Sequence, residues 1–483
     1  MNLTNVSRIL GPLGYVLILF FFKPEGLSPA GVAVLAATFW IALWWITDVT
    51  HIAVTALLPI VLFPLTDAIS LSDTTTAYGH KYIFLYMGGF FLAIAIEKWN
   101  LHKRIALNII AMVGASVSRI VLGFMMATAF MSMWISNTAT SVMMLPIGLA
   151  IIKQLKDHPD TDEDENEIFG KMLMLSIAYS ASIGGIATLF GTPPNLVFAG
   201  IIKELYGVEI SFAKWLSIGL PISLTLLGIA WIYLTKIAFK IQMEEFPGGK
   251  EEILRLRSEL GKMKRGEIIV SVIFALTAIL LILRQWLQNY LPQLDDTIIA
   301  MVAGISLFII PSTDKKGGIL NWAEAVKMPW GVLILFGGGM ALAAGFSQTG
   351  LAVWIGSKFV LLDHLPIVVL ILVLTLSVNF LTEITSNLAT TAMLLPILAP
   401  IAQTIDVHPF LLMIPATIAA SCAFMLPVAT PPNAVVFGSG LLKISDMTKA
   451  GFRLNLISII LIWVFVYFFL EYILGYPLGQ FPF

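Results

Sequence analysis

The sequence contains little charge and almost no cysteine. Only 12% of its 483 residues are charged, against about 25% in an average globular chain. Cys422 stands alone, which excludes a disulfide framework and a thiolate metal cluster. The formal net charge of −1 offers no basic surface, so we expect no nucleic-acid partner. Because no H-E-x-x-H and no G-x-x-x-x-G-K-[ST] motif occurs, we expect no catalytic residues and no transition metal, and an intramembrane enzyme is only a remote alternative.

Apolar residues are correspondingly abundant, at 58% of the chain, and the mean hydropathy is +0.92. Since a bilayer core needs about 20 apolar residues per helix, the sequence predicts an all-α membrane protein with about 11 transmembrane helices. We expect it in the cell (inner or plasma) membrane. The predicted spans lie at 9–22, 29–47, 51–66, 81–98, 172–205, 212–240, 267–283, 296–310, 330–348, 410–440 and 452–474.

Two further apolar blocks, 119–155 and 365–402, carry a polar Ser-Asn pair between two apolar arms. Backbone that turns at membrane depth is tolerated only where it lines a cavity or is buried in protein. We therefore expect two re-entrant helical hairpins whose tips meet near the middle of the membrane. The alternative is two ordinary helix pairs with polar turns at the far surface, and arm length does not separate the two.

Lysine and arginine mark the cytoplasmic side of membrane proteins. They are concentrated in 240–265 and recur around Lys98, Lys315 and Lys443. When successive predicted spans cross the membrane in alternate directions, all of these clusters lie on the cytoplasmic side. The same topology places the N-terminus in the cytoplasm and the C-terminus outside. A few isolated basic residues do not fit this topology, namely Lys203, Lys214, Arg284 and Lys358.

The chain also repeats itself. Ser136-Asn137 recurs 250 positions later as Ser386-Asn387, and Gly88-Gly89 recurs as Gly338-Gly339 at the same offset. Thr-Pro-Pro-Asn occurs at 192–195 and again at 430–433. We expect an inverted-topology repeat, because five spans per copy turn the second copy upside down, as in many secondary transporters. The predicted divisions are an N-terminal span (1–28), a first repeat (29–240), a cytoplasmic charged linker (241–266) and a second repeat (267–483).

The two Thr-Pro-Pro-Asn segments predict unwound loops at 191–195 and 429–433, although a mere kink or a surface loop is the alternative. Proline removes a backbone donor and clashes with the preceding turn, so two in succession break a helix. Broken helix ends present carbonyl oxygens, which suit Na⁺, and N–H groups, which suit anionic oxygens. The tips and loops contain no Lys or Arg, so an anion bound there needs cations. Ligands made only of oxygen favour Na⁺ over a transition metal.

Two more positions have open interpretations. Glu383 precedes the second Ser-Asn pair by three residues, and a carboxylate inside an apolar arm is either functional or a partner of backbone N–H groups. Asp48 and His51 fit a turn at the membrane boundary, and Trp40, Trp44 and Trp45 approach the same end, as an interfacial aromatic belt would.

These motifs, together with Trp45-Ile46-Thr47-Asp48, resemble the divalent-anion:sodium symporter family of di- and tricarboxylate transporters over nearly the whole chain. The resemblance implies a homodimer with scaffold and transport domains and an elevator motion. It implies substrate contacts at Asn137, Thr138, Pro193, Asn387, Leu388 and Pro431. It also implies one Na⁺ at Ser132, Ser136, Asn137 and the Gly191 carbonyl, and a second at Thr382, Thr385, Asn387 and the Ala429 carbonyl.

The predicted function is therefore a sodium-coupled symporter that imports C4-dicarboxylates or related di- and tricarboxylates, with Na⁺ as the coupling ion. A sodium-independent dicarboxylate exchanger of the same fold is the alternative. The oxygen ligands are intact at both cation positions, which favours symport.

One position departs from the family's pattern: Leu388 stands where the dicarboxylate transporters usually have Thr. We expect Leu388→Thr to shift preference toward small dicarboxylates, since it restores a hydroxyl and removes apolar bulk. A net hydrogen bond of about 1 kcal/mol corresponds to a shift of roughly five-fold. Competition of succinate, malate, fumarate, citrate, aspartate and sulfate with substrate uptake measures the shift, and a profile identical to that of the parent would contradict a role for this side chain.

Overall fold

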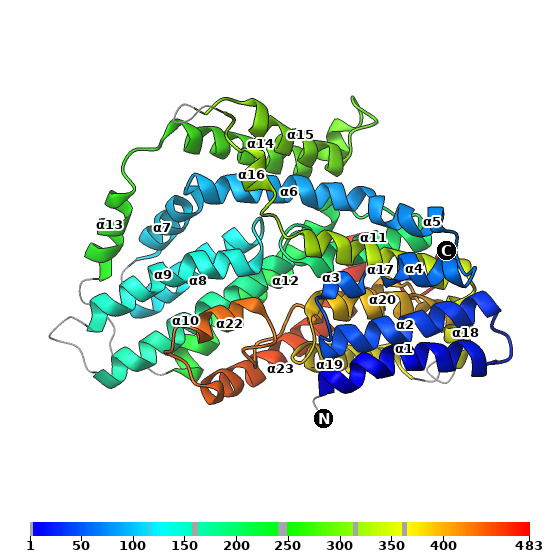
Figure 1. Cartoon of the computed structure of the whole chain (residues 1–483). Coiled ribbons are helices and arrows are strands. Elements are labelled where there is room, and N and C mark those ends of the chain that lie inside the picture. The colour runs from blue at the N-terminus through cyan, green and yellow to red at the C-terminus, as the bar shows by residue number, and fades with distance from the viewer. Residues whose placement is uncertain (1–2, 115, 157–162, 240–248, 313–316, 360–364) are drawn as a thin grey trace.

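The computed structural model describes residues 3–114, 116–156, 163–239, 249–312, 317–359 and 365–483, and these form helices joined by short connections (Figure 1). Within the described residues, nine helices are long and apolar enough to cross a membrane. The predicted spans at 51–66, 296–310 and 410–440 correspond to shorter or interrupted apolar helices. The prediction of an all-helical, multi-pass membrane protein is confirmed.

The first half of the chain contains the first hairpin, α8 and α9, and the first interrupted helix, α10 and α11. Its elements are α1 (Leu3–Phe21), α2 (Pro29–Thr47), α3 (Ile52–Thr55), α4 (Leu58–Leu65), α5 (Leu71–Thr76), η1 (Ala77–Gly79), α6 (Lys81–Lys98), α7 (Leu101–Val113), α8 (Val117–Ser132), α9 (Asn137–Lys156), α10 (Glu163–Ile186), α11 (Pro193–Tyr206), α12 (Phe212–Ile232) and the π-helical turn η2 (Tyr233–Ala238).

The second half follows the same order, with a second hairpin, α19 and α20, and a second interrupted helix, α21 and α22. Its elements are α13 (Gly249–Glu259), α14 (Arg265–Leu287), α15 (Asp296–Ile309), α16 (Trp322–Ala325), α17 (Trp330–Gln348), α18 (Leu351–Lys358), α19 (Ile367–Thr382), α20 (Asn387–Thr404), α21 (Phe410–Ala419), α22 (Pro431–Phe437), α23 (Ile444–Phe468) and α24 (Leu470–Leu474). Part of the predicted linker, 241–248, lies outside the described residues, and α13 forms most of the remainder.

Local sequence explains where several helices begin. Ser28 accepts a hydrogen bond from the Gly31 N–H and is followed by Pro29, a proline at the first helical position. Ser211 caps α12 by accepting from the Lys214 N–H, and Asp295 caps α15 by accepting from the Thr297 N–H. These side chains satisfy N–H groups that the first turn of a helix leaves without a carbonyl partner.

The helices pack into two groups that contact each other along α11 with α17, along α17 with α20 and along α2 with α20. We name the set α1, α2, α4, α6, α14, α15 and α17 the outer group, in which α6 packs along α15 and α1 along α2. We name the set α8–α12 and α19–α23 the central group. Its middle helix is α10, which contacts α8, α9, α12 and α22. The apolar stretch of α10 is 89% buried whereas that of α1 is 11% buried, so α10 forms the core and α1 faces the surroundings.

The predicted spans and hairpins did not include α7 and α18. α7 and α18 follow α6 and α17, and they pack on the hairpin helices α8 and α20. Apolar run length does not detect them, because α7 contains Lys103 and Arg104 and α18 has only eight residues. They connect the outer group to the two hairpins.

Glycine allows two helices of the central group to approach closely. Gly184 of α10 lies against α8, and a Cβ at this position would overlap the backbone of Ala129. We expect Gly184→Ala to lower the unfolding temperature, because overpacking costs about 1–3 kcal/mol. Thermal unfolding in detergent, followed by tryptophan fluorescence, measures the change.

The matched control is Gly228→Ala on α12, where a Cβ would meet open space. This variant should be neutral or slightly stabilising, since alanine is the better helix former. Equal unfolding temperatures for the two variants would show that α8 and α10 are not closely packed at Gly184.

Candidate functional site

All four predicted interruptions line one cavity of about 820 Å³. Hairpin tips contribute 135–139 and 384–388, and the breaks with the helix starts that follow them contribute 190–194 and 428–432. The predicted unwound loops, 191–195 and 429–433, extend too far, because the unwound backbone ends at Thr192 and Thr430 and the prolines occupy the first positions of α11 and α22. The predicted substrate positions all lie on its wall: Asn137, Thr138, Pro193, Asn387, Leu388 and Pro431. Of the predicted sodium ligands, the wall includes Ser136, Gly191, Thr385 and Ala429, while Ser132 and Thr382 are fully buried next to the tips. The two Ser-Asn turns therefore do not lie at separate surfaces.

The first hairpin tip is organised by Ser132, the last residue of α8. Its Oγ donates to the Ala181 carbonyl oxygen at 2.6 Å and lies 2.7 Å from the side-chain oxygen of Asn137. Asn137 starts α9, so the bonds of Ser132 connect both arms of the hairpin to α10. A polar tip is stable here because protein oxygens and amides replace water.

The Asn137 amide faces three oxygens at once. With its nitrogen inward, the amide donates to Ser132 Oγ at 2.7 Å, Gly191 O at 3.1 Å and Ala181 O at 3.2 Å. With its oxygen inward, the same site gathers oxygens from a hydroxyl, an amide and two carbonyls. Oxygens at such distances repel one another unless a donor or a cation lies among them, so the donor set fits a hard cation such as Na⁺.

The second tip uses the same chemistry. Thr382 Oγ1 lies 2.8 Å from Asn387 Oδ1 and donates to the Ala420 carbonyl oxygen at 2.9 Å. Thr385 contributes a further hydroxyl, 2.6 Å from that of Thr390. The sequence repeat is thus also a repeat of hydrogen bonds, with Thr382 in the place of Ser132.

The asparagines of Thr-Pro-Pro-Asn, to which the sequence assigned no role, brace the two loops. Asn195 Nδ2 donates to the carbonyls of Gly185 at 3.0 Å and Thr188 at 2.7 Å. Asn433 Nδ2 donates to the carbonyls of Ala423 at 3.2 Å and Leu426 at 3.0 Å. Each asparagine lies at the start of the second half-helix. Its side chain binds backbone carbonyls at or just after the end of the first half-helix. Its occurrence at the same place in both copies was the signal for this role.

Glu383 is a partner of backbone N–H groups. Its carboxylate accepts from the N–H groups of Phe424, Met425 and Leu426 at 2.8, 2.9 and 3.1 Å. It also accepts from Asn455 at 2.7 Å, and the residue is 2% exposed. These bonds attach the second hairpin to the second unwound loop. They account for Glu383 as a partner of backbone N–H groups, the second of the two interpretations that the sequence left open.

Three charged residues on the cavity wall are exposed to solvent: Asp48, Glu97 and Lys327. We infer that they lie at the mouth of the cavity. Asp48 follows α2 and Glu97 lies in the last turn of α6, whereas Lys327 precedes α17. Lys327 is the single basic residue among the described residues that line the cavity, and the sequence alone gave no reason to place it there.

The expectation that Trp45 belongs to an interfacial belt is wrong. Trp45 is 3% exposed, and its Nε1 donates to the Ile52 carbonyl oxygen at 3.1 Å. It lines the cavity instead. A bond between α2 and the chain that folds back as α3 turns the ring inward, which aromatic spacing along a single helix does not reveal.

Comparison with known families agrees with this geometry. The family described as "Sodium:sulfate symporter transmembrane region" matches residues 4–475. The chain belongs to this family, the divalent-anion:sodium symporters. The resemblance predicted from the repeated motifs is confirmed, and since the family consists of transporters, the chain is not an enzyme.

Two relatives have nearly the same length. The chain is 49% identical to the sodium-dependent dicarboxylate transporter SdcS of Staphylococcus saprophyticus, over 98% of this chain and 93% of the relative. It is 48% identical to SdcS of Staphylococcus aureus strain USA300, with the same coverage.

Two solved structures of transporters share the fold at low identity. The Alcanivorax borkumensis YdaH transporter aligns with a TM-score of 0.60 at 12% identity, over 99% of this chain and 100% of that one. Neisseria gonorrhoeae MtrF, described as one of a class of antimetabolite efflux pumps, aligns with a TM-score of 0.58 at 13% identity, over 97% and 96%. At this identity the likeness concerns the fold alone.

We expect Asn137→Ala and Asn387→Ala each to abolish transport while the protein remains folded. Each change removes the amide that joins the two arms at a hairpin tip and leaves Ser132 or Thr382 without that partner. Uptake into proteoliposomes should fall at least about 100-fold if the lost contacts are worth about 3 kcal/mol. Size-exclusion chromatography establishes that the variants are folded, and normal uptake by either one would refute the tip as a binding site.

Proposed function

We propose that this chain is a sodium-coupled symporter that imports C4-dicarboxylates or related di- and tricarboxylates. The observation that carries the proposal is the single cavity lined by both Ser-Asn tips and both Thr-Pro-Pro loops. The names of the two SdcS relatives support the same substrate class and the same ion.

The donor chemistry supports two sodium positions. Ser132, Ser136, Asn137 and the Gly191 carbonyl would hold one Na⁺, where the Asn137 amide already faces several oxygens. Thr382, Thr385, Asn387 and the Ala429 carbonyl would hold the second, where the contact between Thr382 and Asn387 at 2.8 Å repeats that between Ser132 and Asn137 at 2.7 Å. Bound Na⁺ would supply positive charge that the tips themselves lack.

Helix ends support the position of the substrate. Helices α9, α11 and α20 begin at Asn137, Pro193 and Asn387, all on the cavity wall. The N-terminal end of a helix carries partial positive charge and free N–H groups, so it favours carboxylate oxygens. The substrate would therefore contact Asn137, Thr138, Pro193, Asn387, Leu388 and Pro431, and its charge would be shared between helix ends and Na⁺. This arrangement couples the ions to the anion, because each improves the site of the other.

The packing supports a division into a scaffold and a transport domain. The outer group would be the scaffold, and the central group, which contributes both tips and both loops, would be the transport domain moving as an elevator. The inverted repeat, the domain boundaries at residues 28, 240 and 266, and a homodimer belong to the same proposal. Positive charge near Lys98 and Arg265 supports a cytoplasmic N-terminus and an external C-terminus, and puts the mouth beside Glu97 on the cytoplasmic side.

Uptake of labelled succinate into proteoliposomes tests the proposal. An inward Na⁺ gradient should raise initial uptake by roughly 5–150-fold over K⁺, the range that coupling energies of 1–3 kcal/mol produce. The matched control uses the same vesicles preloaded with dicarboxylate and no Na⁺. Uptake that requires internal dicarboxylate and ignores Na⁺ would instead establish the sodium-independent exchanger.

A further inference from the structure

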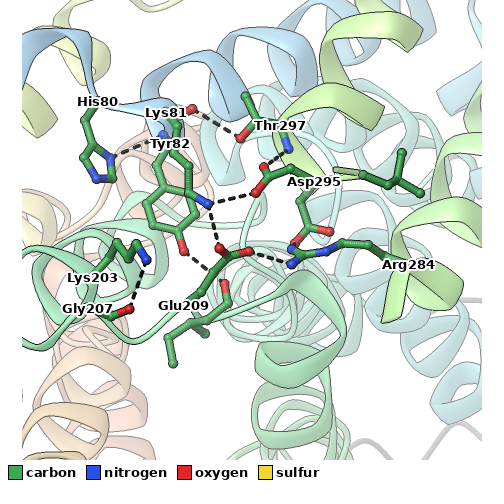
Figure 2. A network of polar contacts seen from close by, with 12 residues as sticks. His80, Lys81, Tyr82, Lys203, Gly207, Glu209, Arg284, Asp295 and Thr297 are labelled. Carbon is green, nitrogen blue, oxygen red and sulfur yellow. Dashed lines mark hydrogen bonds and ion pairs between the residues drawn. The ribbon is translucent and has the colours of Figure 1, made fainter. Parts of the chain in front are cut away.

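A network of five charged residues joins the two helix groups at the end of α6 that is farthest from the cavity mouth. Figure 2 shows its centre, where the Lys81 ammonium lies between Glu209 and Asp295. We name these residues the Glu209 clasp: Lys81, Glu209, Arg284, Asp295 and Asp296.

Glu209 is the member that comes from the central group. It lies in the connection between α11 and α12, and its carboxylate accepts from Lys81 at 2.8 Å and from Arg284 at 2.6 Å. Lys81 begins α6 and Arg284 lies in the last turn of α14, so both cations belong to the outer group. Arg284 is one of the isolated residues that do not fit the predicted topology. Its guanidinium pairs with the carboxylates of Glu209 and Asp296.

The same short segment is held at two further points. Asp296, at the start of α15, accepts from the Phe212 N–H at 2.7 Å and pairs with Arg284 at 3.2 Å. Tyr82 of α6 donates from its hydroxyl to the Ile210 carbonyl oxygen at 3.3 Å. Residues 209, 210 and 212 therefore all bind the outer group, through a side chain, a carbonyl and an N–H.

These charges are largely removed from water. The side chains of Arg284 and Asp296 are 9% and 3% exposed, and that of Glu209 is 28% exposed. Burial raises the pKa of Glu209, but its bonds to Lys81 and Arg284 outweigh burial and lower the pKa below its usual value, so the group is a carboxylate at neutral pH. Partly buried charges are stable only while they are paired. Separating the two groups at this end would leave Glu209 and Arg284 without each other.

The clasp and the cavity mouth lie at opposite ends of α6. Lys81 and Glu97 lie 16 residues apart on α6, about 24 Å at 1.5 Å per residue. Glu97 is at the mouth, so the clasp closes the opposite end. Among the described residues of the second repeat, no carboxylate stands at the matching position: the residue two before the cap of α23 is Leu441, where Glu209 stands two before the Ser211 cap of α12. The clasp therefore favours only one of the two end states.

We propose that Glu209 is a positioning residue that holds the transport domain in the state whose cavity opens beside Asp48, Glu97 and Lys327. The inference rests on the proposed division into scaffold and transport domain. When the transport domain moves toward the other face, Glu209 leaves Lys81 and Arg284, so the clasp contributes to the free-energy difference between the two states.

Labelling of a cavity cysteine from each side of the membrane tests the role of Glu209. The parent carries Val428→Cys, a cavity position that is 83% exposed, and the native Cys422 is fully buried and does not compete. Rates of reaction with an impermeant maleimide are measured in inside-out and right-side-out vesicles. The orientation in which the parent reacts faster defines the mouth side. Adding Glu209→Gln should lower the rate on that side and raise it on the other, changing their ratio by about three-fold or more.

Two variants separate the clasp from a general loss of stability. Glu209→Asp keeps the charge and should restore much of the parent's ratio. Lys171→Gln removes a cation that pairs with Glu167 at 2.7 Å and Asp446 at 3.5 Å, all within the central group, so the ratio should not change. If Glu209→Gln does not fold, Lys81→Gln removes the more exposed cation of the clasp and should move the ratio in the same direction.

An unchanged labelling ratio in Glu209→Gln, or in Lys81→Gln where only that variant folds, would overturn the inference. Sodium-dependent succinate uptake by the otherwise unmodified protein in the same vesicles keeps the two ideas apart. Uptake that depends on Na⁺ together with an unchanged ratio rejects the clasp and leaves the symporter intact. A purely structural role would lower the unfolding temperature of Glu209→Gln without altering the ratio.

Discussion

The fold depends on one constraint: a backbone polar group inside a membrane must find a partner within the protein. Continuous helices meet this condition by themselves, whereas the turns at Ser136 and Ser386 and the breaks before Pro193 and Pro431 do not. The structure places these four interruptions around one cavity and surrounds them with hydroxyls and amides. This arrangement suits the ion binding that we propose, because groups that are costly to bury alone can ligate ions.

A small set of bonds makes the interruptions stable, and it is nearly the same in both halves. Ser132 and Thr382 close the tips, and Asn195 and Asn433 close the loops. The halves differ at Glu383, whose counterpart 250 positions earlier is Met133. In the first half the Met133 carbonyl accepts from the Thr188 hydroxyl, so a neutral bond stands where the second half has a carboxylate with three N–H donors. The two proposed cation positions therefore share the same contacts at the hairpin tips and differ in their electrostatic surroundings.

Charged residues are few in this chain, and α6 carries them at both of its ends. One end of α6 contributes Glu97 to the mouth, and the other contributes Lys81 to the network around Glu209 (Figure 2). The open end keeps its charges in solvent, where they interact weakly, and the closed end pairs them away from solvent, where separation is costly.

The sequence by itself determined the membrane class, the bounds of α6 and α17, the two hairpins and the two breaks, because hydropathy and proline act on the chain locally. It also marked, through their repetition, the tip and loop residues that contribute to the cavity wall. Only the tertiary structure decided that α7 and α18 form, that Trp45 and Lys327 reach the cavity and that Glu383 binds backbone. The same is true of Glu209, which meets Lys81 and Arg284 from 128 and 75 positions away. Contacts over such separations depend on how helices pack, and no local pattern in the chain encodes them.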